Sequence, residues 1–411
     1  MISRIKWGLT VVIASISLLT LIPANANAAV INPHVQAKGA IVVDAKSGQV
    51  LSEQNPDTLL PAASTSKLLT VYLVHQAIQN GKLSWNTRVK ITPNIAKVSI
   101  EPELTNVPLT AGRSYTVSAL YRAALLDSAN AAAMALGQAV SGSQADFVEL
   151  MQKQLNEWGI KTAQIYGAAG LKNNQVYSDA VGGNRQSENM LSVADMAIIA
   201  RHLVNEYPTV LNTTQLQTAR FGKTTLTNTN WLLPGGKVKT QYKFDGLKTG
   251  ASTKAHGNFV GSLTYAKRRL VTVIFGAGSV NAATDPARFI QTNQLLAATL
   301  PKLAYTEQGA MLPQREVDVK TAKERKVTLV VKEPIGLWLP KKHAKIQTTA
   351  HQTQQFNAPF NAEKRVGTVD IKNDVSYLPG VKRPQYSLVT GYAEKRVGFF
   401  ELLWRDIQAI F

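Results

Sequence analysis

Cysteine is absent from this sequence of 411 residues. Its absence excludes disulfide bonds, thiolate nucleophiles and cysteine-ligated metal sites, so the fold has to be stable without covalent cross-links. Histidine is scarce as well, at 6 residues, and no pair of histidines has an HExxH or similarly close ligand spacing. We therefore predict neither a metal site nor a cofactor.

Acidic residues are also few, with 26 Asp and Glu against 45 Lys and Arg, which gives a formal net charge of +19. Hydrophobic residues at 45% and charged residues at 17% are an ordinary globular composition. The length predicts one large domain with a smaller one. An exported basic protein meets anionic lipids and anionic wall polymers before nucleic acid, so we predict no nucleic-acid partner. A solvated basic surface without a specific partner explains the charge equally well.

The longest apolar run near the start covers residues 9–22 and falls short of the roughly 20 residues that span a bilayer. Arg4 and Lys6 precede this run, and small residues follow it up to Ala28. This pattern predicts a signal peptide over residues 1–28 rather than a transmembrane anchor. We expect the mature chain on the extracytoplasmic face of a bacterial membrane or in the cell wall.

The next part of the sequence predicts an α/β domain over residues 32–303. Strand-like runs at 40–43 and 49–52 flank a turn and indicate a hairpin. Apolar residues then recur at three- and four-residue spacing, which predicts helices, over residues 67–78, 116–126, 130–140 and 147–158. Strand patterns return at 258–264 and 270–275, before a last helix around 288–300. Strands at both ends predict one sheet that pairs the beginning of the domain with its end.

Two further segments follow this domain. β-branched runs separated by turn residues predict a small all-β domain over residues 306–390, with strands near 327–331, 335–339 and 366–371. Residues 392–411 predict an amphipathic helix, because large apolar residues share one helical face, namely Phe400, Leu403, Trp404, Ile407 and Phe411. Such a helix suits the interface of an anionic membrane. The alternative is a terminal helix that packs on its own protein.

A candidate nucleophile lies where the first predicted helix begins. Ser64 precedes Lys67 by three residues, and side chains at this spacing share a helix face with Cβ atoms about 5–6 Å apart. A neutral lysine amine can take the serine proton, and for this the pKa of Lys67 has to fall through burial and a second nearby cation. The free N–H groups of the helix N-terminus would also face a developing oxyanion.

This SxxK pattern is weak alone, since Ser3 to Lys6 fits it too. A second element is Ser128 with Asn130, which lie between two predicted helices. Because residues two apart do not share a helix face, both side chains can converge only from a loop. The alternative for Asn130 is a helix N-cap.

A third element is Lys248, Thr249 and Gly250 at the end of a strand-like segment. Gly250 permits close approach of another backbone, and a cation beside a hydroxyl suits a peptide that ends in a carboxylate. Similar triplets occur elsewhere, so the order of the elements and their context decide; the competitors are Lys46-Ser47-Gly48, Ser187 to Asn189 and Ser279 to Asn281.

The order SxxK, SxN, KTG is known from penicillin-binding proteins and serine β-lactamases. Residues 36–302 resemble the D-alanyl-D-alanine carboxypeptidases, and the β-rich segment with Phe356, Asn357, Ala358 and Pro359 resembles their C-terminal domain. The resemblance implies an antiparallel sheet with a helical subdomain, followed by the small β domain and the terminal helix. It also implies a serine-type enzyme that removes the terminal D-alanine from peptidoglycan stem peptides and is inhibited by β-lactams.

The resemblance assigns roles residue by residue. It makes Ser64 the nucleophile that is acylated, Lys67 its proton acceptor and Ser128 a proton relay toward the leaving D-alanine. Asn130 would hold the peptide amide.

On the strand, the resemblance makes Lys248, Thr249 and Gly250 part of the substrate-binding site, where Lys248 and Thr249 bind the terminal carboxylate. The backbone N–H groups of Ser64 and Ala251 would form the oxyanion hole.

The sequence departs from the family pattern at three positions. Ala131 stands where Asp often follows SxN, Ser252 ends the KTGxT pattern, and Gly167 replaces the Asn ahead of Gly170 and Leu171. None of the three is assigned to bond making, so they bear on substrate preference and rate. We interpret His256, close to the third motif, as structural.

Two rival functions remain open. A β-lactamase usually presents a carboxylate after the SxN element, and no ExxLN segment follows Ser128; residues 101–105 resemble one loosely but precede it. A non-catalytic wall-binding protein on the same scaffold would not need all three motifs intact. The sequence does not distinguish transfer of the acyl group to water from transfer to a second peptide.

Overall fold

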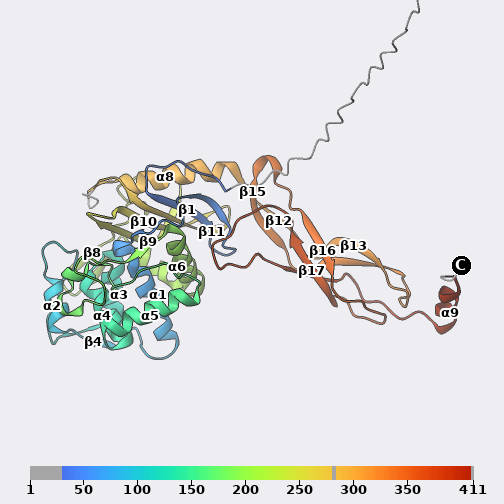
Figure 1. Ribbon diagram of the computed structural model, residues 1–411, viewed down its shortest axis with the longest axis horizontal. Helices are drawn as coiled ribbons and strands as arrows, with labels where there is room; N and C mark the ends of the chain where they lie inside the picture. Colours follow the sequence, from blue (N-terminus) through green and yellow to red (C-terminus); the bar gives the residue numbers. More distant parts are fainter. Residues whose placement is uncertain (1–29, 280–283, 409–411) are drawn as a thin grey trace, which may run out of the picture.

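A computed structural model describes residues 30–279 and 284–408. The predicted signal peptide lies outside the described residues. Figure 1 shows a larger α/β domain, an elongated β domain beside it, and the last helix at the far end of the β domain. Within the described residues, no helix has the length and apolar character needed to cross a membrane.

The larger domain is built on an antiparallel sheet of five strands in the order β2-β1-β11-β10-β9. β1 pairs with β11 along its whole length, which confirms that the beginning of the domain pairs with its end. The strands are β1 (Gly39–Asp44), β2 (Val50–Gln54), β9 (Lys243–Ser252), β10 (His256–Tyr265) and β11 (Arg268–Ala277). β9 is an edge strand, so one side of its backbone faces the helical region.

Apolar side chains on both faces of β1 explain why both faces of the sheet are covered. Ile41 and Val43 belong to the core shared with the helical region, whereas Ala40 and Val42 belong to a second core beneath α8 (Ala287–Thr299). Successive side chains of a strand point to opposite faces, so apolar residues at both parities require cover on both sides. Figure 1 shows α8 on one face and the helical region on the other.

The four helices predicted for the middle of the chain are present. They are α1 (Lys67–Gln79), α3 (Val117–Leu126), α4 (Asn130–Ser141) and α5 (Gln144–Glu157). The sequence patterns missed α2 (Pro93–Ser99), α6 (Val193–Glu206) and α7 (Leu211–Thr214). They also missed short strand pairs of this region, namely β3 (Leu60–Pro61) with β6 (Met190–Leu191), β4 (Arg88–Lys90) with β5 (Ser114–Thr116), and β7 (Thr218–Phe221) with β8 (Thr224–Thr227).

The second domain is all-β, as predicted. Its sheet has the order β13-β14-β18-β17-β16, and β12 pairs with β15. The strands are β12 (Leu303–Gln308), β13 (Leu312–Asp318), β14 (Lys326–Val331), β15 (Ile335–Pro340), β16 (Thr348–Gln352), β17 (Arg365–Ile371) and β18 (Tyr386–Thr390). The domain has its own hydrophobic core, in which Val327, Leu329 and Val366 are fully buried.

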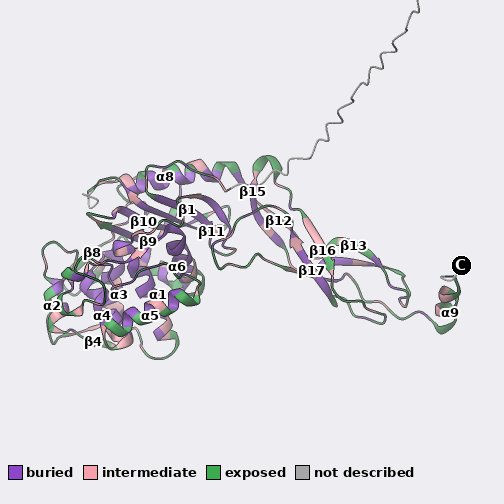
Figure 2. Ribbon diagram, viewed as in Figure 1, coloured by how far each residue is buried: buried purple, intermediate pink, exposed green. Residues whose placement is uncertain are grey.

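The terminal helix, α9 (Phe399–Gln408), begins later than the sequence pattern indicated. Residues 394 and 396 form isolated bridges with Phe360 and Ala322, so the chain is extended there and not helical. The apolar face of α9 is in the solvent (Figure 2), with exposed fractions of 83% at Phe400 and 60% at Trp404. Phe411 lies outside the described residues.

The two domains meet at a buried carboxylate. Asp44, at the end of β1, is fully buried and accepts two hydrogen bonds from the Arg268 guanidinium, at 2.7 and 2.8 Å. It also accepts a 2.9 Å hydrogen bond from the indole N–H of Trp338 on β15. Gln49 bonds both backbone groups of Trp338 through its amide. A few polar side chains therefore join the β domain to the catalytic sheet.

Candidate active site

Ser64 and Lys67 are brought together by a short 3-10 helix, Ala63–Ser66, that leads into α1. The Lys67 amine donates a 2.7 Å hydrogen bond to Ser64 Oγ. It also donates to Asn130 Oδ1 at 2.7 Å and to the Ala169 carbonyl at 3.1 Å. The amine is thus fixed by three partners; in its neutral form it has two hydrogens for Asn130 and Ala169 and accepts the hydrogen bond of the Ser64 hydroxyl.

Burial and a second cation lower the pKa of Lys67 well below its ordinary value. Its side chain is fully buried, and the charge of Lys248 adds to the effect of desolvation. Burial also lowers the pKa of Lys248, to about 7, helped by the charge of Arg288. These are the two causes that a neutral lysine base requires.

Ser128 lies in the connection between α3 and α4, as predicted, whereas Asn130 belongs to α4. Ser128 has a left-handed backbone, with φ of 59°, and is buried. Asn130 is the first residue of α4 and does not cap it, since its Oδ1 accepts from Lys67 and its Nδ2 donates to the Thr105 carbonyl at 3.0 Å. Within the described residues, no side-chain hydrogen bond joins Ser128 to either lysine, so its relay role stays a prediction.

The third motif lies on β9, the edge strand that faces the Ser64 turn. A Cβ at Gly250 would lie 3.0 Å from the Ala62 carbonyl and 3.1 Å from the Thr65 nitrogen, so glycine permits this approach and alanine would require the turn to shift by a few tenths of an ångström. Lys248 is buried and donates to the Thr249 carbonyl at 3.0 Å. Ala251 is exposed on the same strand, beside the turn.

A buried asparagine of β10 holds the Ser64 turn against the sheet. Asn258 donates to the carbonyls of Pro61 and Ala62, at 2.8 and 3.2 Å. Its Oδ1 accepts from the Gly276 N–H on β11 at 2.9 Å. The nucleophile is therefore positioned by the sheet as well as by its own helix.

The loop with Gly167 and Gly170 packs against the other side of the turn. Gly170 has φ of +75°, and a Cβ there would lie 2.0 Å from the Ala63 carbonyl. Asn189 shapes this loop, because its Oδ1 accepts from the N–H groups of Tyr166 and Gly167 at 2.7 and 3.2 Å. The Ser187 to Asn189 triplet is thus a structural element of the loop and not a second SxN motif.

Ser64 opens into a cavity of ≈ 230 Å³. Its walls carry Asn130, Leu171 and Ala251, together with two carboxylates, Glu103 and Glu188. A peptide carbonyl placed in this cavity would meet the hydroxyl of Ser64 on one side and the edge of β9 on the other.

Residues 26–279 match the family described as D-alanyl-D-alanine carboxypeptidase. The chain belongs to this family. Residues 305–388 match the family described as penicillin-binding protein 5, C-terminal domain. These matches agree with the resemblance inferred from the three motifs.

Individual relatives of this carboxypeptidase-family chain give the same picture. The D-alanyl-D-alanine carboxypeptidase DacC of Escherichia coli is 28% identical over 90% of this chain and 88% of its own. A crystal structure titled as a peptidoglycan synthesis regulatory factor (PBP3) from Streptococcus pneumoniae is 32% identical, with a TM-score of 0.75, and covers 89% of this chain and 100% of its own. Penicillin-binding protein D2 from Listeria monocytogenes, in a cefotaxime-bound form, is 30% identical over 65% of this chain and 98% of its own, with a TM-score of 0.54.

The sequence motifs did not identify three residues that the structure places at the site. Arg288 on α8 is buried and donates to the Gly250 carbonyl at 3.2 Å, and Thr229 shares a 2.5 Å hydrogen bond with the Thr249 hydroxyl. Glu188 lines the Ser64 cavity after the SxN element, where the sequence showed no ExxLN segment. None lies in the three motifs assigned to the site, although Glu188 is the middle residue of the Ser187 to Asn189 triplet, and only the folded chain brings them to the site.

Other sequence candidates lie elsewhere. Lys46 to Gly48 form the turn between β1 and β2, as expected. His256 bonds the Gly278 carbonyl through its ring at 2.8 Å, which supports the structural interpretation. Ser279 donates its N–H to Asp285, and Asn281 lies outside the described residues. Among the residues described, no cluster of three or more His, Asp or Glu side chains is arranged to bind a metal ion.

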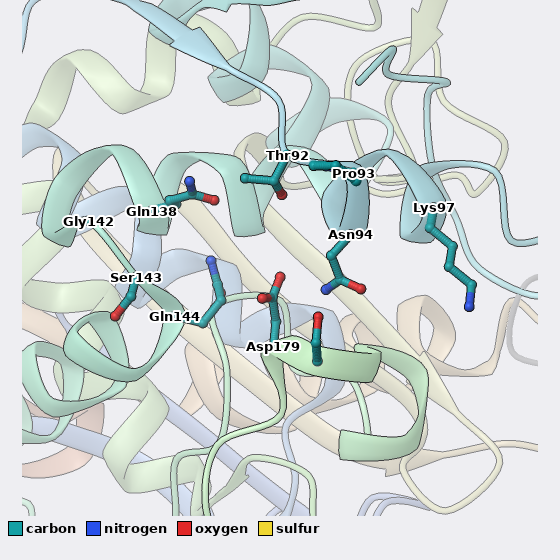
Figure 3. Close-up of a pocket in the computed structure, with 10 residues that line it drawn as sticks. Thr92, Pro93, Asn94, Lys97, Gln138, Gly142, Ser143, Gln144 and Asp179 are labelled. Carbon is teal, nitrogen blue, oxygen red and sulfur yellow. The ribbon is translucent and has the colours of Figure 1, made fainter. Parts of the chain in front are cut away.

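A larger cavity, of ≈ 600 Å³, lies between α2 and the start of α5 (Figure 3). Asn94, Gln144 and Asp179 point into it. It contains none of the motif residues, so its size does not make it the active site.

Proposed function

We propose that the protein is a serine-type D-alanyl-D-alanine carboxypeptidase that works through an acyl-enzyme on Ser64. The observation that carries this proposal is the 2.7 Å hydrogen bond between the Ser64 hydroxyl and the amine of Lys67, a buried lysine with a lowered pKa. A neutral amine at this distance is a general base for the hydroxyl.

In the first half-reaction, Lys67 takes the Ser64 proton while Oγ bonds to the carbonyl carbon of the penultimate D-alanine. The N–H groups of Ser64 and Ala251 stabilise the oxyanion. The C–N bond then breaks as the proton taken by Lys67 is relayed through Ser128 to the leaving amine, so both side chains return to their starting protonation states.

Recognition of the substrate follows from the other residues. The terminal carboxylate binds at the end of β9, which carries Lys248, Thr249 and Gly250. Arg288 adds positive charge beside this end of the strand. Asn130 holds the peptide amide with the part of its side chain that Lys67 leaves free. Water then releases the acyl group, and β-lactams acylate the same serine.

Intact-protein mass spectrometry after brief exposure to benzylpenicillin tests the proposal. We expect one persistent adduct on the wild type and none on Ser64→Ala, and release of free D-alanine from a synthetic peptide ending in D-Ala-D-Ala. No adduct on the folded wild type would favour the non-catalytic wall-binding protein, and an adduct lost within seconds would favour a β-lactamase. Predominant cross-linking of two peptides would indicate a transpeptidase.

We also propose that the chain is exported by its first 28 residues and held at an anionic membrane surface by α9. Two observations support attachment through α9. Its apolar face is exposed, and Lys and Arg outnumber Asp and Glu in the whole sequence. Burial of such a face in a lipid interface is favourable, and anionic lipids add electrostatic attraction.

Cosedimentation with vesicles of anionic phospholipid measures this attachment. We expect Phe400→Ser with Trp404→Ser to abolish binding and Ile100→Ser, an exposed apolar residue of the other domain, to leave it unchanged. Equal binding by both variants would contradict attachment through α9.

A further inference from the structure

Glu188 is a buried carboxylate that the proposed steps do not use. Its side chain is only 2% exposed. Within the described part of the chain, its Oε1 atom has no hydrogen-bond partner. Buried polar atoms are nearly always paired, so an exception calls for an explanation at this site.

The position of Glu188 suggests what the missing partner is. The residue lines the same cavity as Ser64, on the side where Ala251 and Ser252 end β9. An ionised carboxylate oxygen can only accept a hydrogen bond, so its partner is a donor, and the cavity is the space beside Glu188 in which such a donor can bind. The donor is therefore a water molecule or an N–H group of the substrate.

The charges around the carboxylate favour a neutral donor. Lys172 also lines the cavity, and Lys172 and Lys254 both act on Glu188 through their positive charge. Two cations beside the carboxylate repel a substrate ammonium group. A cavity of ≈ 230 Å³ has room for ordered water, whose share of liquid volume is about 30 Å³.

We propose that Glu188 is the general base that activates the water for hydrolysis of the Ser64 acyl ester. This inference rests on the proposed function, because it concerns the second half-reaction at the same serine. Glu188 takes one proton from the water, and the water oxygen bonds to the ester carbon. The carbonyl electron pair moves to the oxygen held by the N–H groups of Ser64 and Ala251.

Collapse of this tetrahedral intermediate completes the hydrolysis and accounts for every proton. The C=O bond forms again, the bond between the carbon and Ser64 Oγ breaks, and Oγ receives the proton that Glu188 had taken. The second proton of the water stays on the shortened peptide, which leaves as a carboxylic acid. The enzyme returns to its starting protonation state without any other reactant.

The surroundings of Glu188 fit this role. Its neighbour Asn189 is fully buried and makes three hydrogen bonds to the backbone of Tyr166 and Gly167, which fixes this part of the loop. Burial raises the pKa of Glu188, while Lys254, Lys172 and the Ser252 hydroxyl act in the opposite direction. Because burial raises its pKa while the nearby positive charges and the Ser252 hydroxyl limit the rise, the Glu188 carboxyl group is a stronger base than a free glutamate and still ionises. Ser252, the departure from KTGxT, therefore has a local function.

The test separates acylation from deacylation in Glu188→Gln. The rate of adduct formation with benzylpenicillin and the lifetime of the adduct are followed by intact-protein mass spectrometry. We expect acylation within about twofold of wild type and deacylation slowed by about 100-fold or more, the range of general-base catalysis. Native acylation also shows that the variant is folded.

Glu103→Gln is the matched control, because Glu103 is an exposed carboxylate on the wall of the same cavity. It should leave both rates unchanged. If Glu188→Gln is acylated and deacylated like wild type, the inference is wrong while the proposed function stands. If it lowers acylation by peptide through a higher KM and leaves the adduct lifetime unchanged, Glu188 binds a substrate N–H instead. If even the wild type forms no adduct, the proposed function itself fails.

Discussion

Lys67 and Lys248 are both buried, and the charge of Lys248 makes the charged form of Lys67 less favourable. This charge is one of the two causes that lower the pKa of Lys67. Because the neutral form of Lys67 is the proposed base, the acylation rate should rise with pH through the pKa of Lys67. In the proposed mechanism, the strand motif thus helps to activate Ser64 in addition to binding the substrate carboxylate.

Substitution Lys248→Gln tests this coupling at the level of one residue. Removing the charge raises the pKa of Lys67, so the acidic limb of the pH profile for acylation should move to higher pH. Lys248→Arg keeps the charge and should keep the limb in place, even where the absolute rate falls. Stopped-flow acylation with a chromogenic cephalosporin gives both profiles, and an unmoved limb in Lys248→Gln would argue against the coupling.

At the scale of elements, the site is a junction of segments that approach with their backbones. The Ser64 turn lies between the edge of β9 and the loop with Gly170, and both contacts are tight at a glycine. Because backbone atoms do not adapt as flexible side chains do, a methyl group at Gly170 has to displace a segment, whereas one at Gly250 requires a shift of only a few tenths of an ångström.

Gly170→Ala should therefore abolish acylation of Ser64. The added Cβ meets the Ala63 carbonyl, and the left-handed backbone at φ of +75° is strained for alanine. We expect a loss of about 1–3 kcal/mol in unfolding free energy. Gly167→Ala in the same loop is the control, since no heavy atom lies within 4 Å of its Cβ and it should behave as wild type. Denaturant unfolding and penicillin acylation measure the two effects.

At the scale of the whole molecule, Asp44 joins the two domains. Burial alone would raise the pKa of Asp44, but hydrogen bonds from Arg268, Ser47 and Trp338 outweigh it and hold the pKa below its ordinary 3.8. A carboxylate with a lowered pKa stabilises the folded state above the pKa of the unfolded chain. This stability is lost as the pH falls through the lower, folded pKa.

Asp44→Asn should lower the unfolding free energy at neutral pH by about 3 kcal/mol, because Arg268 loses its buried partner. The difference from wild type should shrink below pH 3.8, where Asp44 of the unfolded chain becomes protonated, and should vanish below the lower pKa of the folded protein. Asp318→Asn removes an exposed ion pair with Arg325 and should change stability little at any pH. Thermal unfolding between neutral and acidic pH distinguishes the two, and a pH-independent difference for Asp44→Asn would contradict the linkage.

The sequence alone determined the local parts of this protein. The spacing of Ser64 and Lys67 on one helix start, the strand that carries Lys248 and Thr249, and the β-rich second domain follow from periodicities of a few residues. Local periodicity does not specify where an element begins. The predicted helix began at residue 392, whereas α9 begins at Phe399, because long-range bridges at residues 394 and 396 keep the segment before α9 extended. α6 was missed although it is well capped by Ser192 and Asp195.

Only the tertiary structure decided how the motif residues act on one another. Asn130 reaches Lys67 across 63 residues of sequence, and Arg288 and Glu188 reach the site from outside the three assigned motifs. The lowered pKa of Lys67 and the unpaired oxygen of Glu188 depend on burial and on charges from distant segments. Local spacing in a sequence specifies neither quantity, because desolvation and electrostatic contact arise only when those segments pack together.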